Sequence, residues 1–235
     1  MKMKQDFLGQ KILLLTAHPD DESYAAAGTI YKNYQAGGWT VLVCATYGEK
    51  GTSHLKKKIS ATELKKLRKR EMTKAAKLLH IAPTHFIGLP DGKVRANKKK
   101  IYEYFLKQAN KYKPQVIMGY GPDGISGHHD HVAVGIIARR VAKKIKVPYA
   151  AFTLPPKIQK QALAYLKTRR QAKHYINDIK FMKPNITVRI NPAIKKKALR
   201  CHASQMDGSN AFTGFPEFAV KELLKAEHFV FYKER

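Results

Sequence analysis

The sequence has few cysteines, few acidic residues and no long apolar run. It contains only two cysteines, Cys44 and Cys201, which excludes a disulfide framework. No apolar stretch approaches the roughly 18 residues of a membrane span, and the early run 12–17 is too short for a signal peptide. We therefore expect a cytoplasmic protein without a transmembrane segment, in which both thiols are buried structural residues.

Acidic residues are outnumbered, 17 against 45 lysines and arginines, which gives a net charge of +28. Such a surface attracts nucleic acid, anionic membranes or anionic substrates. The basic residues are spread along the chain, however, and no zinc-finger spacing, RNP-type aromatic signature or GXXG loop accompanies them. We interpret the charge as a lysine-rich solvated surface and expect no nucleic-acid partner. An anionic small-molecule substrate and a homo-oligomer are both compatible with it.

Short apolar runs alternate with longer helix-patterned segments, which is typical of βαβ units on a parallel sheet. We expect strands at 12–17, 39–46, 84–87, 115–119, 149–153, 186–190 and 229–232. Helices are expected at 24–35, 61–80, 98–112, 132–146, 159–174 and 218–226, with local signals at Gly37-Gly38 (helix end), Ser60–Glu63 (capping box) and Asn191-Pro192 (helix start). The predicted fold is α/β, a Rossmann-like three-layer sandwich around a mainly parallel sheet, in one domain covering residues 1–235.

Two polar motifs each follow a predicted strand. Ala17–Glu22 contains one histidine and three acids, and Gly127–His131 contains three histidines and one acid. Open α/β sheets bind ligands beyond the carboxyl ends of their strands, so the two motifs should meet on one rim. Crowded carboxylates repel one another unless a cation or a proton intervenes, and a catalytic zinc needs three nitrogen or oxygen ligands. The pair therefore predicts a metal site, although either motif alone could simply cap a helix.

With these motifs the sequence resembles the PIG-L/LmbE-like family of zinc-dependent N-acetylglucosaminyl de-N-acetylases. The resemblance is carried by Ala17–Glu22 and Ser126–His131, with weaker agreement at Tyr47–Gly51, Arg68–Glu71, Leu89–Gly92 and His202–Gln205. It implies a hydrolase that removes the N-acetyl group from an N-acetylglucosamine-type sugar conjugate. It also implies a zinc cofactor, with iron(II) as the alternative because a His/His/Asp site suits both metals.

The resemblance assigns a role to each residue that matches the family's motifs. It makes His18, Asp21 and His131 the metal ligands, Asp20 the general base, His128 the residue that stabilises the oxyanion or donates a proton, and Arg68 the arginine that binds sugar hydroxyls. Independent chemistry agrees, because a carboxylate beside a ligand can take a proton from water and an imidazole near the metal can meet an oxyanion. The family has proline where this chain has His129, which makes His129 a second-choice ligand.

Several alternatives stay open from the sequence. Asp130 either orients an imidazole from outside the ligand set or caps the following helix. Glu49 and Asp91 are candidates for the rim of the site by position only, and His202 is more typical of a packed histidine. Two other functions also fit: a metal-dependent phosphoesterase acting on an anionic substrate, and a basic nucleic-acid or anion-binding protein on the same fold.

Overall fold

The computed structural model describes residues 7–51, 53–55, 57–167, 182–207, 210–212 and 217–234. Its centre is a seven-stranded sheet in the order β3-β2-β1-β4-β5-β7-β6. The strands are β1 (Lys11–Thr16), β2 (Trp39–Thr46), β3 (Ile81–Leu89), β4 (Val116–Tyr120), β5 (Tyr149–Thr153), β6 (Ile186–Arg189) and β7 (Ala226–Tyr232). The first five are parallel, whereas β7 runs antiparallel to β5 and to β6.

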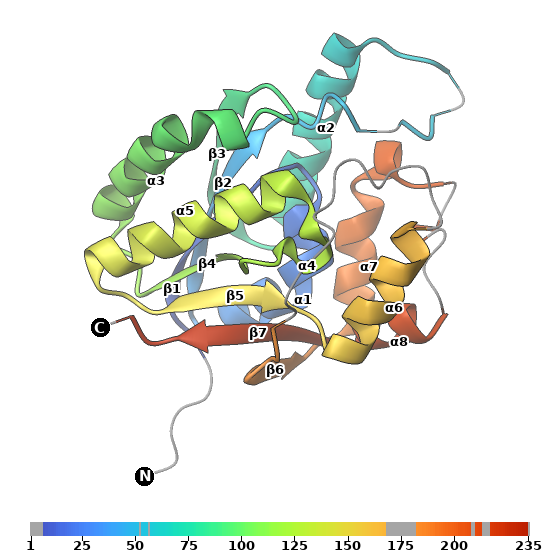
Figure 1. Ribbon diagram of the computed structural model, residues 1–235. Helices are drawn as coiled ribbons and strands as arrows, with labels where there is room; N and C mark the ends of the chain where they lie inside the picture. Colours follow the sequence, from blue (N-terminus) through green and yellow to red (C-terminus); the bar gives the residue numbers. More distant parts are fainter. Residues whose placement is uncertain are drawn as a thin grey trace.

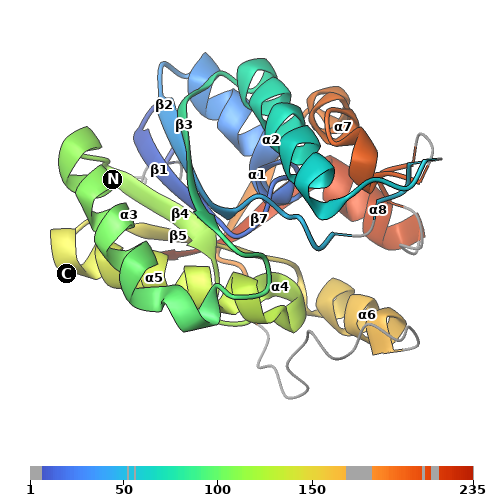
Figure 2. The ribbon, with the colours of Figure 1, turned by 90° about the horizontal axis from the view of Figure 1, so that it is seen from above.

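Helices cover both faces of this sheet (Figures 1 and 2). One face carries α1 (Asp21–Gln35), α2 (Ala61–Leu78), α7 (Pro192–Arg200) and α8 (Glu217–Lys225), and the other carries α3 (Lys98–Tyr112) and α5 (His129–Ile145). Two shorter helices, α4 (Gly124–Gly127) and α6 (Pro156–Lys167), follow β4 and β5. The predicted three-layer α/β fold is thus confirmed. Within the described residues, no helix is both long and apolar enough to cross a membrane.

The core lies where the sheet is covered on both faces. Every residue of β4 and β5 is buried, as are all residues of β1 after Lys11. Strands buried on both faces are near-continuous apolar runs, which is why these segments were recognisable in the sequence. Both cysteines are buried as predicted: Cys44 is fully inaccessible within β2 and Cys201 is 9% exposed at the end of α7.

Local signals confirm several element boundaries, and the differences have physical reasons. Ser60 and Glu63 form the predicted capping box, and Asn191 caps α7 through the N–H of Ala193. Strand β3 begins three residues earlier than predicted, because an edge strand tolerates Pro83, which has no N–H to donate. The helix predicted at 159–174 begins at Pro156, and residues 168–181 lie outside the described residues.

The strand order reverses between β1 and β4. The chain passes from β1 outward to β2 and β3 on one side, then returns to β4 and continues to β5 on the other. Ligands of open α/β sheets bind at such a reversal of strand order, beyond the carboxyl ends of the strands. The motif Ala17–Glu22 leaves β1 at this point, and the motif Gly127–His131 follows β4. Each of them enters a helix, α1 or α5.

Candidate metal centre

The structure brings the three predicted metal ligands together. His131 Nε2 lies 3.3 Å from His18 Nδ1 and 3.3 Å from Asp21 Oδ1, and the latter two atoms are 4.0 Å apart. Ligands 2.0–2.2 Å from a tetrahedral ion are separated from one another by about 3.3–3.6 Å. Two of the three separations have this length and the third, between His18 Nδ1 and Asp21 Oδ1, is about 0.4 Å longer, so the three atoms form a triangle close to the size that a zinc-like ion requires.

Asp21 is oriented by the backbone that precedes it. Its Oδ2 accepts hydrogen bonds from the N–H groups of Ala17 and His18, both at 2.9 Å, which leaves Oδ1 to face the imidazoles. The residue begins α1 and is 4% exposed. Burial alone would raise the pKa of the Asp21 carboxyl, but the neighbouring His131 and His18 hold this pKa far below its usual range. The Asp21 carboxyl therefore favours its ionised form beside the two imidazoles.

His18 is held between carboxylates on both of its ring nitrogens. Its Nε2 lies 3.2 Å from Asp91 Oδ1 and 3.4 Å from Asp130 Oδ2, on the side opposite Asp21. Burial disfavours a charged imidazole, but Asp130, Asp91 and Asp21 together raise the pKa of His18 to about 10. This surplus of carboxylate around one imidazole is stabilised by a positive charge, which either a proton or a metal ion supplies.

Asp130 contacts His18 rather than capping the helix. The N-cap of α5 is His128, whose Nδ1 accepts the N–H of Asp130 at 3.2 Å. The carboxylate of Asp130 also accepts the N–H of Gly92 at 3.0 Å, which fixes its orientation towards His18. Asp130 is thus placed to orient the imidazole of His18, while the N-cap of α5 is His128.

His128 forms a second group of possible metal donors, together with His18 and His131. Its ring lies beside those of His18 and His131, with centroids 5.1 and 4.7 Å away, and the three imidazoles can hold a metal ion together. Burial and the nearby His131 and His18 lower the pKa of His128 to about 3. His129 occupies the first position of α5, and among the described residues it belongs to neither of the two donor groups that His18 forms.

Asp20 adopts a backbone conformation that only its contacts explain. Its φ of 114° lies in the region that L-residues rarely adopt, and such strain persists only where the surroundings impose it. The N–H of Asp20 donates to Glu22 Oε2 at 3.2 Å, and its Oδ2 lies 3.0 Å from Arg68 Nη2. Burial raises the pKa of Asp20 to about 6, an effect that Arg68 opposes. A buried carboxylate with a raised pKa suits a general base.

Arg68 was expected to bind sugar hydroxyls, but its guanidinium is engaged with the protein. It is 3% exposed, and besides Asp20 it donates to the backbone carbonyls of Gly48, at 2.8 Å, and of Pro19. Gly48 has a φ of +69°, and a Cβ at this position would collide with the guanidinium. Arg68 therefore joins α2 to the loops after β1 and β2 and fixes the orientation of Asp20.

Three residues near the site were missed or undervalued. Fully buried Glu22 accepts from Ser23 Oγ at 2.7 Å and lies 2.8 Å from His202 Nε2, so that the segment after α7 packs against the first motif. Tyr120, the last residue of β4, stacks on His131 with ring centroids 4.1 Å apart. Asp91, considered only by position, contacts His18 directly. A strand-end position was the single sequence signal for Tyr120.

The comparisons with known proteins identify the family. The model of PIG-L, the GlcNAc-PI de-N-acetylases, matches residues 13–142, which is more than half of the chain. The protein therefore belongs to this family, and the predicted resemblance is confirmed. The 1D-myo-inositol 2-acetamido-2-deoxy-alpha-D-glucopyranoside deacetylase of Corynebacterium diphtheriae is 25% identical over 233 residues, covering 86% of this chain and 78% of that protein. The probable N-acetyl-alpha-D-glucosaminyl L-malate deacetylase 2 of Bacillus subtilis is 26% identical over 201 residues, covering 85% of each chain.

Solved structures of the same fold carry different reactions. The N,N'-diacetylchitobiose deacetylase of Pyrococcus horikoshii aligns with a TM-score of 0.69 at 21% identity, covering 95% of this chain and 84% of that one. The 4-carboxy-2-hydroxymuconate hydratase GalB of Pseudomonas putida aligns with a TM-score of 0.70 at 19% identity, covering 96% and 97%. Because a deacetylase and a hydratase share the fold, the function must be argued from the site.

Proposed function

We propose that the protein is a metal-dependent amide hydrolase that removes the acetyl group from the nitrogen of an N-acetylglucosamine-type sugar conjugate. The observation that carries this proposal is the triangle of His18, Asp21 and His131 donors next to Asp20, a partly buried carboxylate that is not one of the three. Family membership and the deacetylase names of the relatives point to the same reaction.

The donor set fits a single zinc ion. Two imidazole nitrogens and one carboxylate oxygen are ligands typical of catalytic zinc sites, which keep a further position open for water or substrate. Iron(II) is the alternative metal, because the same donors suit it. When bound, the metal lowers the pKa of water and polarises the amide carbonyl. His18, Asp21 and His131 would hold it, with Asp91 and Asp130 orienting the ring of His18.

The remaining residues supply the proton transfers. Asp20 takes the proton from the attacking water and is kept in position by Arg68. His128, the N-cap of α5, meets the developing oxyanion or gives a proton to the leaving amine. In this proposal Arg68 acts through Asp20, and sugar binding by Arg68 is the alternative. The net charge of +28 favours a conjugate whose aglycone is anionic.

The metal and the reaction are tested with one pair of variants. Metal per chain is measured by elemental analysis for the wild type, Asp21→Ala and Glu217→Ala, purified identically without chelator. Amine release is followed with N-acetylglucosaminyl-inositol, N-acetylglucosaminyl-malate and N,N'-diacetylchitobiose. Glu217 is a solvent-exposed acid on α8 and serves as the matched control. We expect about one metal per chain and amine release in the wild type and the control, and neither in Asp21→Ala.

Two outcomes would contradict the proposal. Wild-type protein without metal, even after zinc or iron(II) is added back, would exclude the metal centre. Release of phosphate from phosphorylated sugars, with no amine from any of the acetylated ones, would favour a phosphoesterase instead.

A further inference from the structure

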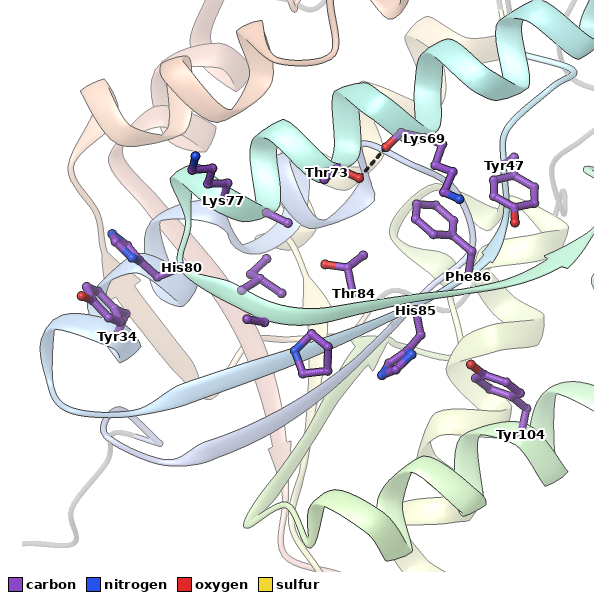
Figure 3. A pocket seen from close by; sticks show the side chains of 14 residues that line it. Tyr34, Tyr47, Lys69, Thr73, Lys77, His80, Thr84, His85, Phe86 and Tyr104 are labelled. Atoms are coloured by element: carbon purple, nitrogen blue, oxygen red, sulfur yellow. Dashed lines mark hydrogen bonds between the residues drawn. The ribbon is translucent and has the colours of Figure 1, made fainter.

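A cavity lies along the outer edge of β3, and we refer to it as the β3-edge groove (Figure 3). It has a volume of about 800 Å³ and 14 lining residues, which include Tyr34 of α1, Tyr47 after β2 and His80 before β3, while the others come from α2, β3 and α3. Strand β3 is the end strand of the described sheet and pairs only with β2. None of the residues assigned to the metal centre lines this groove.

The walls of the β3-edge groove carry positive charge only. Lys69, Lys77 and His80 are exposed at its surface, and none of the 14 lining residues is acidic. Lys65 adds an ammonium group 4.4 Å from the ring centroid of Tyr47. Lys69 and Lys77 are eight residues apart on α2, which corresponds to about 12 Å along the helix axis. Two cations at this distance suit the repeated anionic groups of a polymer better than a single small anion.

Stacked aromatic rings lie at both ends of the groove. Tyr34 stacks on His80 with centroids 3.8 Å apart, and Tyr47 stacks on Phe86 with centroids 5.0 Å apart. Figure 3 shows the first pair near the start of β3 and the second pair further along the strand. Tyr34 is 46% exposed, so its ring is accessible to a ligand. Accessible rings beside cations are suited to planar, anionic partners.

The strand edge itself is poorly suited to a further strand. Pro83 offers no N–H to a neighbour, and β3 has an extra residue opposite Thr40 and Leu42 of β2. Prolines and bulges on edge strands are devices that prevent strand addition. A second copy of the chain would also place another net charge of +28 against a basic groove. Charge complementarity therefore favours an anionic occupant over a copy of this protein.

We propose that the β3-edge groove binds single-stranded nucleic acid. Lys69 and Lys77 contact the phosphates, while an exposed base stacks on Tyr34. Proteins that bind single strands without sequence preference combine a basic groove with aromatic platforms in this way. The sequence shows no nucleic-acid motif because the residues of the groove come from separate elements, which only the fold brings together. The groove is independent of the proposed deacetylase reaction.

The phosphate contacts are tested by fluorescence anisotropy with a short labelled oligothymidylate, between about 50 and 200 mM salt. Lys69→Ala/Lys77→Ala removes two positive charges from the groove. Lys144→Ala/Lys196→Ala removes the same charge from exposed positions on α5 and α7. Each phosphate contact contributes about 0.7 to the slope of log affinity against log salt. We expect the groove variant to lose about 1.4 in slope and at least tenfold in affinity, and the control to match the wild type.

The stacking contacts are tested at a single position. Tyr34→Ala should lower the affinity for oligothymidylate about tenfold, because stacking of one base is lost. Tyr34→Phe keeps the ring and should bind like the wild type. Inorganic polyphosphate, which has charge but no bases, should bind more weakly than the oligonucleotide and should not respond to Tyr34→Ala. Asp21→Ala should bind oligothymidylate normally, which separates this proposal from the deacetylase activity.

Several results would overturn the proposal. Equal losses in the groove variant and its control would mean that the overall charge, and not the groove, binds the oligonucleotide. Polyphosphate or double-stranded DNA binding as tightly as oligothymidylate would exclude base stacking. A dimer of the wild type that Lys69→Ala/Lys77→Ala dissociates, without any binding of oligothymidylate, would identify a second copy as the occupant.

Discussion

Two clusters of buried charge differ in whether the chain neutralises them. In the first, Lys195 Nζ lies 2.9 Å from Glu227 Oε1, and both side chains are 1% exposed. Glu227 also accepts the N–H groups of Gly28 and Thr29, at 3.1 and 2.7 Å, so its carboxylate is paired and hydrogen-bonded. One positive and one negative charge cancel here, and the pair links α7 and β7 to α1.

The metal centre has the opposite balance. Around His18 lie the carboxylates of Asp21, Asp91 and Asp130, and Asp20 follows within the same motif. Among the described residues, the ion-pair partners of these acids are Arg68, which pairs with Asp20, and imidazoles, which carry a charge only when protonated. A buried pair that is internally complete contributes to structure, whereas a cluster with surplus carboxylate needs a cation from outside. The difference separates a structural ion pair from a binding site, and it predicts opposite responses to substitution.

Asp20→Asn should have the largest effect, which is a loss of activity without a loss of metal or of stability. Asparagine tolerates the positive φ of this position but cannot accept the proton of the attacking water. We expect deacetylase activity to fall about 10²–10⁴-fold with metal content unchanged. The side-chain oxygen of asparagine can still accept a hydrogen bond from Arg68, so the free energy of unfolding should change little. Activity within a factor of a few of the wild type would show that another group is the base.

Glu227→Gln should have the opposite profile, with a large loss of stability and little loss of activity per folded molecule. The variant leaves the ammonium of Lys195 buried without its partner, which costs about 3–5 kcal/mol. Urea denaturation measures the loss. The double variant Lys195→Met/Glu227→Gln removes both charges and should recover part of the stability, since no unpaired ion remains. Equal or additive losses in the double variant would mean that the two residues are not coupled.

Arg68→Lys should have an intermediate effect that decides between its two roles. Lysine keeps the charge but cannot donate at once to Pro19, Asp20 and Gly48 as the guanidinium does. If Arg68 positions Asp20, kcat falls by about tenfold or more while KM changes little. A rise in KM at unchanged kcat would instead support the role predicted from the sequence, in which Arg68 binds sugar hydroxyls. Steady-state kinetics of the metal-loaded enzyme distinguish the two results.

The fold was predictable because its signals are local. Buried parallel strands such as 12–17 and 149–153 are unbroken apolar runs, and the capping box at Ser60 marks a helix start within four residues. The starts of α1 and α5 were predicted three residues late. Their first turns contain the polar residues Asp21 and His129, which belong to the motifs and give no apolar periodicity. Because the first turns of α1 and α5 are made of polar residues of the candidate site, the apolar pattern did not show where these helices begin.

The candidate site was predictable only in part, because its supporting contacts are distant in sequence. His18 and His131 stood out through their motifs, although they are 113 residues apart. The contact of Glu22 with His202 spans 180 residues, and neither residue carries a local signal that names its partner. Arg68 was singled out by resemblance, yet its partners became evident only once α2 was placed beside the loops after β1 and β2.

The smallest effect is expected at His228. Its carboxylate partner offsets only part of the cost of burying a charged imidazole, so His228 is intermediate between the two kinds of cluster. Its Nε2 lies 2.9 Å from Glu222 Oε1 and its Nδ1 lies 3.0 Å from Thr187 Oγ1. Burial lowers the pKa of His228 below its ordinary 6.5, although Glu222 opposes this shift. Protonation therefore disfavours the folded state. The resulting stability is present above pH 6.5 and is lost as the pH falls through 6.5 towards the lower pKa of the folded protein. Urea denaturation at neutral pH and at about pH 5.5 measures how much of the free energy of unfolding is lost on acidification. This loss should be smaller in His228→Gln than in the wild type. An identical loss would assign the acid sensitivity to other groups.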